Sequence, residues 1–218
     1  MLKRLFSWFR REEGPDEMRR RLLRRFPNHR ELIDSREIPH EHATGPDLTY
    51  YIESAQFYYE LIVESAPEMD DPQLSSRDYN RIVHASWGMI AQGADAVPFA
   101  IKLVRSSNRD QREAAGNVFC GLRDPARLPD ILSQIHATLA NETDQLVLDT
   151  LLGALGSLRS RESIPVLAPY ILNESVDPDT RDNAACSLGQ IVRKRFDKSA
   201  VGTIPAACEW LAAKGYRA

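Results

Sequence analysis

The sequence predicts an all-helical protein in which pairs of helices repeat along the chain and stack on one another. Four aspartates recur at separations of 32, 34 and 35 residues, and each begins a segment whose apolar residues fall on one helix face. Each segment passes a glycine and then reaches an aliphatic residue followed by proline. Self-similarity at a period of this length is the signature of a helical repeat array.

The first helix of each repeat is predicted by a cap, an apolar face and a closing glycine. An aspartate side chain accepts hydrogen bonds from the free N–H groups of a first helical turn and complements the positive end of the helix dipole. We expect the glycines to permit close packing of neighbouring helices. The predicted caps are Asp78, Asp110, Asp144 and Asp179, and the glycines are Gly88, Gly121, Gly156 and Gly189.

The second helix of each repeat is predicted by proline. Proline suits the first turn of a helix because its missing N–H would be unpaired there and its φ is already helical. A helix pair has more apolar surface than it can bury alone, so successive pairs must stack into an α-solenoid. The four prolines are Pro98, Pro129, Pro165 and Pro205.

The residues of the fourth repeat carry a resemblance to a known family. Asp177-Pro178-Asp179 and Arg181, followed by Ala184-Ala185, Leu188-Gly189 and Ile191, resemble the HEAT repeat in its short, bilin-lyase-like form. Ser163 to Leu167 resembles the second helix of that pattern. The resemblance covers residues 78 to 214. It implies a right-handed α-α superhelix, the HEAT-type α-solenoid, and a scaffold for partners rather than an activity.

Two features depart from the HEAT pattern. The third repeat has Leu146 where the second and fourth have Arg112 and Arg181. The fourth repeat carries an insertion, Arg193 to Ser199, before its second helix.

The chain before the repeats is predicted to form two further parts. Residues 1–45 are a basic, amphipathic N-terminal extension and linker, and residues 46–77 are a capping helix and loop ahead of the four HEAT-like repeats in 78–218. The capping helix is predicted by the apolar and aromatic stretch from Tyr50 to Val63, in which Ile52, Ala55, Gln56, Tyr59 and Ile62 share one face.

The extension has the pattern of an interfacial helix. Leu2, Leu5, Phe6 and Phe9 recur at helical spacing beside basic residues. Residues 1–36 carry 11 Lys and Arg against 6 Asp and Glu, so a head of +5 precedes a body of −8. Three uses stay open: docking on the body, contact with an anionic membrane surface or nucleic acid, and insertion into a partner's groove. Docking or partner contact is favoured over membrane binding, because 11 residues bury little apolar area.

The apolar runs and the cysteines of the sequence predict where in the cell the protein is located. No apolar run approaches the roughly 20 residues that span a bilayer. The start of the chain lacks the apolar stretch of a secretory signal, so we expect this N-terminal segment not to be cleaved. The cysteines, Cys120, Cys186 and Cys208, are odd in number and far apart, which favours reduced core thiols and a cytoplasmic location.

No set of residues predicts catalysis. His40-Glu41-His42 lies in a loop pattern without a second cluster at metal-ligand spacing, and His29, His84 and His136 are isolated. The sequence contains neither a nucleophile elbow nor a phosphate loop nor a dinucleotide fingerprint. We therefore expect no enzyme activity, no catalytic residue, no metal and no cofactor.

The predicted partner-binding residues lie on the second helices. Tyr170 and Trp210 each come five residues after the proline of their repeat, in register with Leu103 and Gln134. If these helices line a concave surface, as in HEAT proteins, the side chains form a stripe there, with Lys102, Arg105, Asp130 and Glu209 at its rim. The competing interpretation is that the aromatic side chains pack between helices and the charges are merely solvated. The predicted site is Lys102, Arg105, Gln134, Tyr170 and Trp210.

Three functions follow as hypotheses. The leading one is a non-enzymatic protein-binding module or adaptor that uses its concave face, by analogy a bacterial immunity or regulatory partner protein. The second is a DNA-acting enzyme similar to the HEAT-like alkylpurine glycosylases, or another nucleic-acid-binding protein; a body of −8 makes nucleic acid an unfavourable partner. The third is a bilin lyase-like protein that handles a chromophore.

Overall fold

A computed structural model describes residues 54–66, 76–122 and 124–217, with the side chains of 76–81 and His84 left out. The described residues contain nine α-helices and three short 3₁₀ helices, and no strand. The predicted all-helical class is therefore confirmed for this part of the chain. The basic extension, His40 and His42, and the first residues of the predicted capping helix lie outside the described residues.

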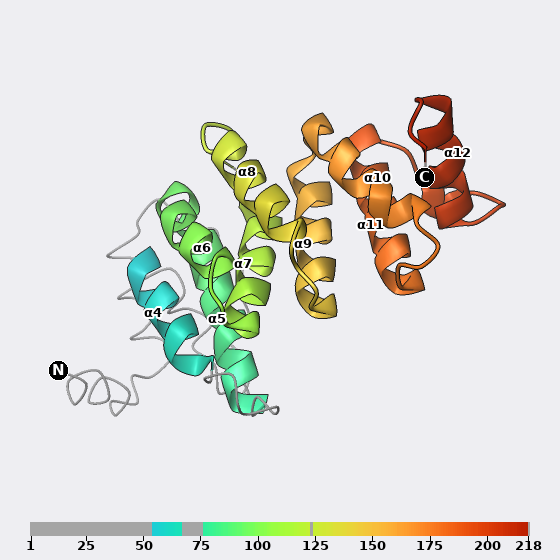
Figure 1. Cartoon of the computed structure of the whole chain (residues 1–218). Helices are drawn as coiled ribbons and strands as arrows, with labels where there is room; N and C mark the ends of the chain where they lie inside the picture. The colour runs from blue at the N-terminus through green and yellow to red at the C-terminus, as the bar shows by residue number, and fades with distance from the viewer. Residues whose placement is uncertain (1–53, 67–75, 123, 218) are drawn as a thin grey trace, which may run out of the picture. The chain divides into compact units, whose positions relative to one another are not determined.

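The helices form two rows (Figure 1). In the first row α5 packs on α7, α7 on α9 and α9 on α11. In the second row α4 packs on α6, α6 on α8 and α10 on α12. The first row consists of α5 (Ser76–Ala91), α7 (Arg109–Gly121), α9 (Gln145–Leu158) and α11 (Pro178–Val192). The second row consists of α4 (Ala55–Ser65), α6 (Val97–Val104), α8 (Leu128–Leu139), α10 (Ile164–Leu172) and α12 (Thr203–Ala213).

The predicted helix pairs are present as α5 and α6, α7 and α8, α9 and α10, and α11 and α12. The 3₁₀ helices η4 (Gly93–Ala96), η5 (Arg161–Ser163) and η6 (Phe196–Lys198) join the two members of three of these pairs. The repeat prolines do begin second helices: Pro98, Pro129 and Pro165 lie in the first two positions of theirs, and Pro205 is the third residue of α12.

The core runs through the first row. Leu151 and Leu155 of α9 are four residues apart and fully buried, as are Phe119 of α7 and Leu188 of α11. Helix α9 packs against α7 on one side and α11 on the other, and it accordingly buries residues around most of its circumference. The buried residues of α9 are Val147, Leu151, Leu152, Ala154, Leu155 and Gly156.

Close helix approach explains one repeat glycine particularly well. A Cβ on Gly156 would lie 2.8 Å from Ser187 Cα, a backbone atom of α11 that cannot rotate away. Gly88 and Gly121 are equally crowded, against the side chains of Tyr58 and Ile90 on the preceding helices. The prediction of close packing at these glycines is confirmed.

The predicted helix caps are correct at one position and wrong at three. Asp144 caps α9, where its carboxylate accepts from the N–H groups of Leu146 and Val147. Helix α7 is capped by Asn108 instead of Asp110, and α11 by Asp177 instead of Asp179. The cap residue must lie before the helix with a non-helical backbone, whereas Asp110 and Asp179 are each the second helical residue. Asp78 is likewise inside its helix, as the third residue of α5.

The caps change the alignment of the repeats. Arg112 and Arg181 each lie four residues after their cap, and the same position in the third repeat is Leu148. The predicted correspondence with Leu146 is therefore wrong by two residues. Arg112 donates to the carbonyls of Ser106 and Ser107, and Arg181 to the carbonyl of Ile171. Each arginine thus satisfies backbone groups at the end of the preceding second-row helix.

A helix is present over Ala55–Ser65, within the stretch predicted as a capping helix, but its buried face differs in part from the prediction. Tyr58 and Ile62 are buried, while Gln56 is exposed and Tyr59 is half-buried. Helix α4 packs on both α5 and α6, so the face that it buries is the one directed towards these two helices. In the insertion of the fourth repeat, Phe196 is buried in η6, which packs on α11 and α12. Within the described residues, no helix combines the length and apolar character needed to cross a bilayer.

Candidate functional site

All five predicted partner-binding residues lie on the second row of helices. Lys102 is in α6 and Arg105 is the residue that ends it, Gln134 is in α8, Tyr170 in α10 and Trp210 in α12. Lys102 and Arg105 are exposed, and the other three are half-buried. All five thus lie on or at the end of the second helices, where the sequence analysis placed them, and their role in binding a partner stays a prediction.

Two of the predicted residues are in contact. Arg105 Nε donates to Gln134 Oε1 over 2.7 Å, although 29 positions separate them in the chain. Both side chains lie at the surface, so the bond joins the exposed sides of α6 and α8.

Lys102 lies over an aromatic pair that the sequence did not single out. Its Nζ is 5.1 Å from the ring centre of Phe99 and 5.7 Å from that of Tyr59, and the two ring centres are 5.4 Å apart. An ammonium group at this distance is attracted by the negative face of an aromatic ring. The cluster links α4 to α6 and extends the surface of the second row towards the N-terminus of the described region.

Tyr170 is held at its hydroxyl end. Its Oη donates to the carbonyl of Leu139, the last residue of α8, over 2.8 Å. Burial, with a smaller effect of the Glu142 charge, raises the pKa of the Tyr170 phenol, so the hydroxyl stays a neutral donor. The competing interpretation of Tyr170 as a contact between helices is therefore correct for its hydroxyl, while the ring remains partly exposed.

Similar contacts join the other second-row helices. Thr138 Oγ1 of α8 lies 3.5 Å from the carbonyl of Val104 in α6, and Cys208 Sγ of α12 lies 3.9 Å from that of Ile171 in α10. With the Tyr170 bond, each second-row helix from α8 to α12 reaches the C-terminal end of the one before it. Side-chain contacts thus link the second-row helices one after another from α6 to α12.

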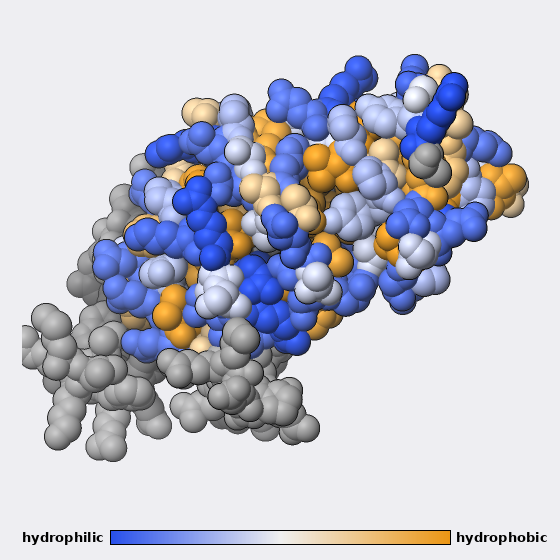
Figure 2. Space-filling view, viewed as in Figure 1, coloured by the Kyte–Doolittle hydropathy of each residue, from blue (hydrophilic) through white to orange (hydrophobic). Residues whose placement is uncertain are grey.

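The exposed side of α10 has an unusual chemistry for a surface helix. The helix contains no charged residue, and its exposed positions are Pro165 and Pro169. On α12, Pro205 is exposed and Trp210 half-buried. Figure 2 shows apolar and weakly polar side chains at the surface over α10, between hydrophilic side chains along the edges.

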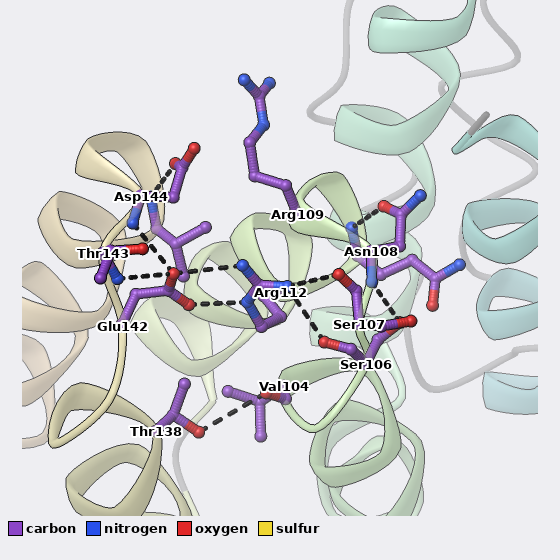
Figure 3. Close-up of polar contacts among 12 residues, drawn as sticks. Val104, Ser106, Ser107, Asn108, Arg109, Arg112, Thr138, Glu142, Thr143 and Asp144 are labelled. Carbon is purple, nitrogen blue, oxygen red and sulfur yellow. Dashed lines mark hydrogen bonds and ion pairs between the residues drawn. The ribbon is translucent and has the colours of Figure 1, made fainter. Parts of the chain in front are cut away.

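A further polar cluster includes none of the five predicted residues. Arg112 of α7 donates to both carboxylate oxygens of Glu142, over 2.6 and 3.1 Å, and to the carbonyls of Ser106 and Ser107 (Figure 3). Glu142 also accepts from the N–H groups of Thr143 and Asp144. The Glu142 side chain is only 5% exposed. Figure 3 shows Arg109 pointing away from this cluster. The cluster joins the connection before α7 to the connection after α8.

Two carboxyl groups, those of Glu142 and Glu113, have pKa values shifted in opposite directions. Burial alone would raise the pKa of Glu142, but the hydrogen bonds from Arg112 and from the backbone of Asp144 and Thr143 outweigh it and hold that pKa below its usual value. Burial raises the pKa of Glu113, against the Arg109 charge and with smaller contributions from Asp110 and Asp144. Folding therefore favours the charged form of Glu142 and disfavours the charged form of Glu113.

One histidine approaches a hydroxyl group. His136 Nε2 of α8 lies 3.1 Å from Ser163 Oγ, and burial lowers the pKa of His136 despite the opposing charge of Glu162. Ser163 is fully buried, so no substrate reaches its oxygen in this conformation. The pair connects α8 to the start of α10, a role that sequence spacing did not indicate.

The described residues contain no group of three or more His, Cys, Asp or Glu side chains placed to hold a metal ion. Among the described residues, Cys120, Cys186 and Cys208 form no disulfide, and they are half-buried rather than part of the core. Burial, followed by the nearby Asp182 carboxylate, raises the pKa of Cys186.

Comparison with known proteins gives no match for this chain among family models, curated proteins or solved structures.

Proposed function

We propose that this chain is a non-enzymatic, HEAT-type protein-binding module whose partner contacts the second row of helices. The single observation that supports this most is the continuity of that row, in which side chains of α8, α10 and α12 each reach the end of the preceding helix. In this proposal the rows belong to a right-handed superhelix and the second row is its concave face.

The size of the row suits a macromolecular partner. Neighbouring packed helices lie about 10 Å apart, so α6 to α12 span on the order of 30 Å. A standard protein interface covers about 800 Å² on each partner, which a strip of this length accommodates.

The chemistry of the row also suits a protein. Tyr170 presents a ring whose hydroxyl is already bound to Leu139, so little conformational entropy is lost when a partner covers it. The exposed prolines of α10 and the half-buried Trp210 add apolar area, and Lys102 and Arg105 add positive charge at one end. A more specific version of the proposal is that the protein binds its partner in a regulatory or immunity role.

The test is a pull-down with the full-length chain as bait, followed by mapping of the contact. We expect a protein that is recovered stoichiometrically by the wild type to be lost by the double variant Gln134→Ala/Trp210→Ala. The matched control is Gln190→Ala, at an exposed position of α11 in the other row. Thermal unfolding of all variants shows whether they remain folded. Retention of the partner by the folded double variant excludes the second row as the binding surface.

A further inference from the structure

Helices α9 and α11 end in basic residues at the same edge of the molecule. The two helices pack side by side and in parallel: Thr180 Oγ1 donates to Asp149 Oδ1 over 2.9 Å near their starts, and Gly156 meets Ser187 near their ends. Arg159 and Arg161 follow α9, and Arg193 and Lys194 follow α11. We call these four residues the basic edge.

The arginines of the basic edge differ from most others in their contacts. Within the described part of the chain, the guanidinium groups of Arg159, Arg161 and Arg193 are exposed and make neither a hydrogen bond nor an ion pair. By contrast, most other described arginines are bound to a carboxylate, an amide or a carbonyl. These bound arginines are Arg105, Arg109, Arg112, Arg127, Arg181 and Arg195.

The backbone gives a second, independent observation. Arg159 and Arg193 have φ values of 57° and 58°, and they are the two non-glycine residues with positive φ in the described chain. Glycine is the residue that this left-handed conformation favours. A cation one position earlier, still in helical conformation, would be attracted equally well by the negative end of the helix dipole. Arginine at both caps therefore indicates that the position of these guanidinium groups matters.

The opposite ends of the same helices are acidic. Glu142 and Asp144 precede α9, and Glu174, Asp177 and Asp179 lie before or at the start of α11. At the basic edge, Asp197 is paired with Arg195, and Glu162 is the one carboxylate between Arg159 and Ser163. In Figure 2, hydrophilic side chains project above the upper ends of α9 and α11. The four cations of the basic edge thus lie together on a body that carries −8 outside residues 1–36.

We propose that the basic edge binds an acidic peptide segment of a partner protein, through a surface distinct from the second row of helices. Neighbouring helix ends lie about 10 Å apart. An extended peptide rises about 3.3 Å per residue and alternates its side chains between two faces, so carboxylates two or four residues apart share a face at about 7 or 13 Å and bracket that distance. A guanidinium group binds a carboxylate with two parallel hydrogen bonds, which an ammonium group cannot do.

A nucleic acid fits this surface less well than a peptide. Affinity for nucleic acid grows with the number of phosphates that are neutralised, and four cations at two adjacent helix ends neutralise few. A longer polyanion would also meet the field of the acidic body, which carries −8 outside residues 1–36.

The test measures binding of a fluorescein-labelled oligoglutamate peptide to the full-length chain, with an oligoglutamine peptide of equal length as the blank. The variant Arg159→Gly/Arg193→Gly removes both guanidinium groups and places the favoured residue at both caps. We expect its Kd to rise at least about tenfold, since two charge-assisted contacts are lost, while its Tm is unchanged or higher. The control Arg10→Gln/Arg11→Gln makes the same change in net charge outside the described residues and should retain affinity.

Two results would overturn the proposal. If the glycine variant binds the peptide as well as the wild type, or the Arg10 and Arg11 control loses as much affinity, the basic edge is not the site. If a DNA duplex binds more tightly than the peptide and the glycine variant loses that binding, the edge serves nucleic acid instead. Loss of a pull-down partner by Gln134→Ala/Trp210→Ala tests only the second row of helices. That outcome is independent of peptide binding at the basic edge.

Discussion

Arg112 is the residue on which the connections around α7 converge. Its Nε and Nη2 donate to Glu142, and its Nη1 donates to two carbonyls of the connection between α6 and α7. The side chains of Arg112 and Glu142 are 18% and 5% exposed. Removing one partner of such a pair leaves the other charge poorly solvated, which costs more than the pair itself contributes.

We expect Arg112→Met to lower the free energy of unfolding by about 3 kcal/mol, because Glu142 then lacks its cation. The matched control is Arg127→Met, just before α8. Arg127 and Asp130 are 50% and 60% exposed in their ion pair, so the loss of Arg127 should cost at most about 0.5 kcal/mol. Urea unfolding followed by circular dichroism measures both values. Equal losses would show that the Arg112 pair is no stronger than a surface pair.

The two shifted carboxyl groups predict opposite pH effects. The pKa of Glu142 is lower in the folded than in the unfolded chain, so its contribution is fully present above the unfolded value and is lost as pH falls through the folded value. The pKa of Glu113 is raised, so its charged form destabilises the fold above the folded value, and this cost disappears as pH falls below the unfolded value.

We therefore expect Glu113→Gln to stabilise the protein at neutral pH and Glu142→Gln to destabilise it. The Glu113→Gln difference should shrink as pH falls towards the ordinary Glu pKa of about 4.3, and the Glu142→Gln difference should shrink as pH falls below it. The free energy of unfolding is measured for the three proteins across that range. A Glu113→Gln variant that is less stable than the wild type at neutral pH would contradict the assignment.

At the scale of the helix, the distance between α9 and α11 is set by a glycine. The crowded atom opposite Gly156 belongs to the backbone of α11, so a methyl group there must push the two helices apart. Gly153, one turn earlier on α9, has room: a Cβ would lie 3.9 Å from Asn183 Oδ1 and 4.0 Å from Cys120 Sγ.

The pair Gly156→Ala and Gly153→Ala separates helix propensity from packing. Both replace glycine by a better helix former in one helix, so Gly153→Ala should stabilise by about 0.5 kcal/mol. Gly156→Ala should instead destabilise by about 2 kcal/mol through overpacking. Thermal and urea unfolding of the two variants test this. Stabilisation by both would mean that the contact between α9 and α11 adjusts freely.

Across the described region, burial is uneven along the rows. Helix α9 lies between α7 and α11 and buries Leu151, Leu152 and Leu155, whereas α12 buries only Ala207 and Leu211. Local opening costs less where few apolar contacts must be broken.

We expect the backbone amides of α9 to exchange with deuterium most slowly and those of α12 much faster. Hydrogen exchange followed by mass spectrometry, read helix by helix, measures this order. Exchange of α12 at the rate of α9 would show that the described helices open as a single unit instead of from the end.

The sequence by itself determined the helices and their pairing. Caps, apolar periodicity and prolines are local signals, and Pro98, Pro129 and Pro165 mark second helices because proline acts on the backbone at its own position. The same signals placed the predicted site residues on one row. Local signals were less accurate for the exact residue at which a helix begins. Asp177 and Asp179 are both of a residue type that caps helices, and only the backbone shows that α11 begins between them.

Only the tertiary structure decided which side chains meet. Arg112 and Glu142 are 30 residues apart, Tyr170 and Leu139 are 31 apart, and Arg105 and Gln134 are 29 apart. These pairs depend on how far one helix is shifted and rotated against the next, and the repeat period specifies neither. The packing of large side chains against glycines and neighbouring helices sets that geometry, so the contacts, and the arginines left without a partner, follow from the assembled rows.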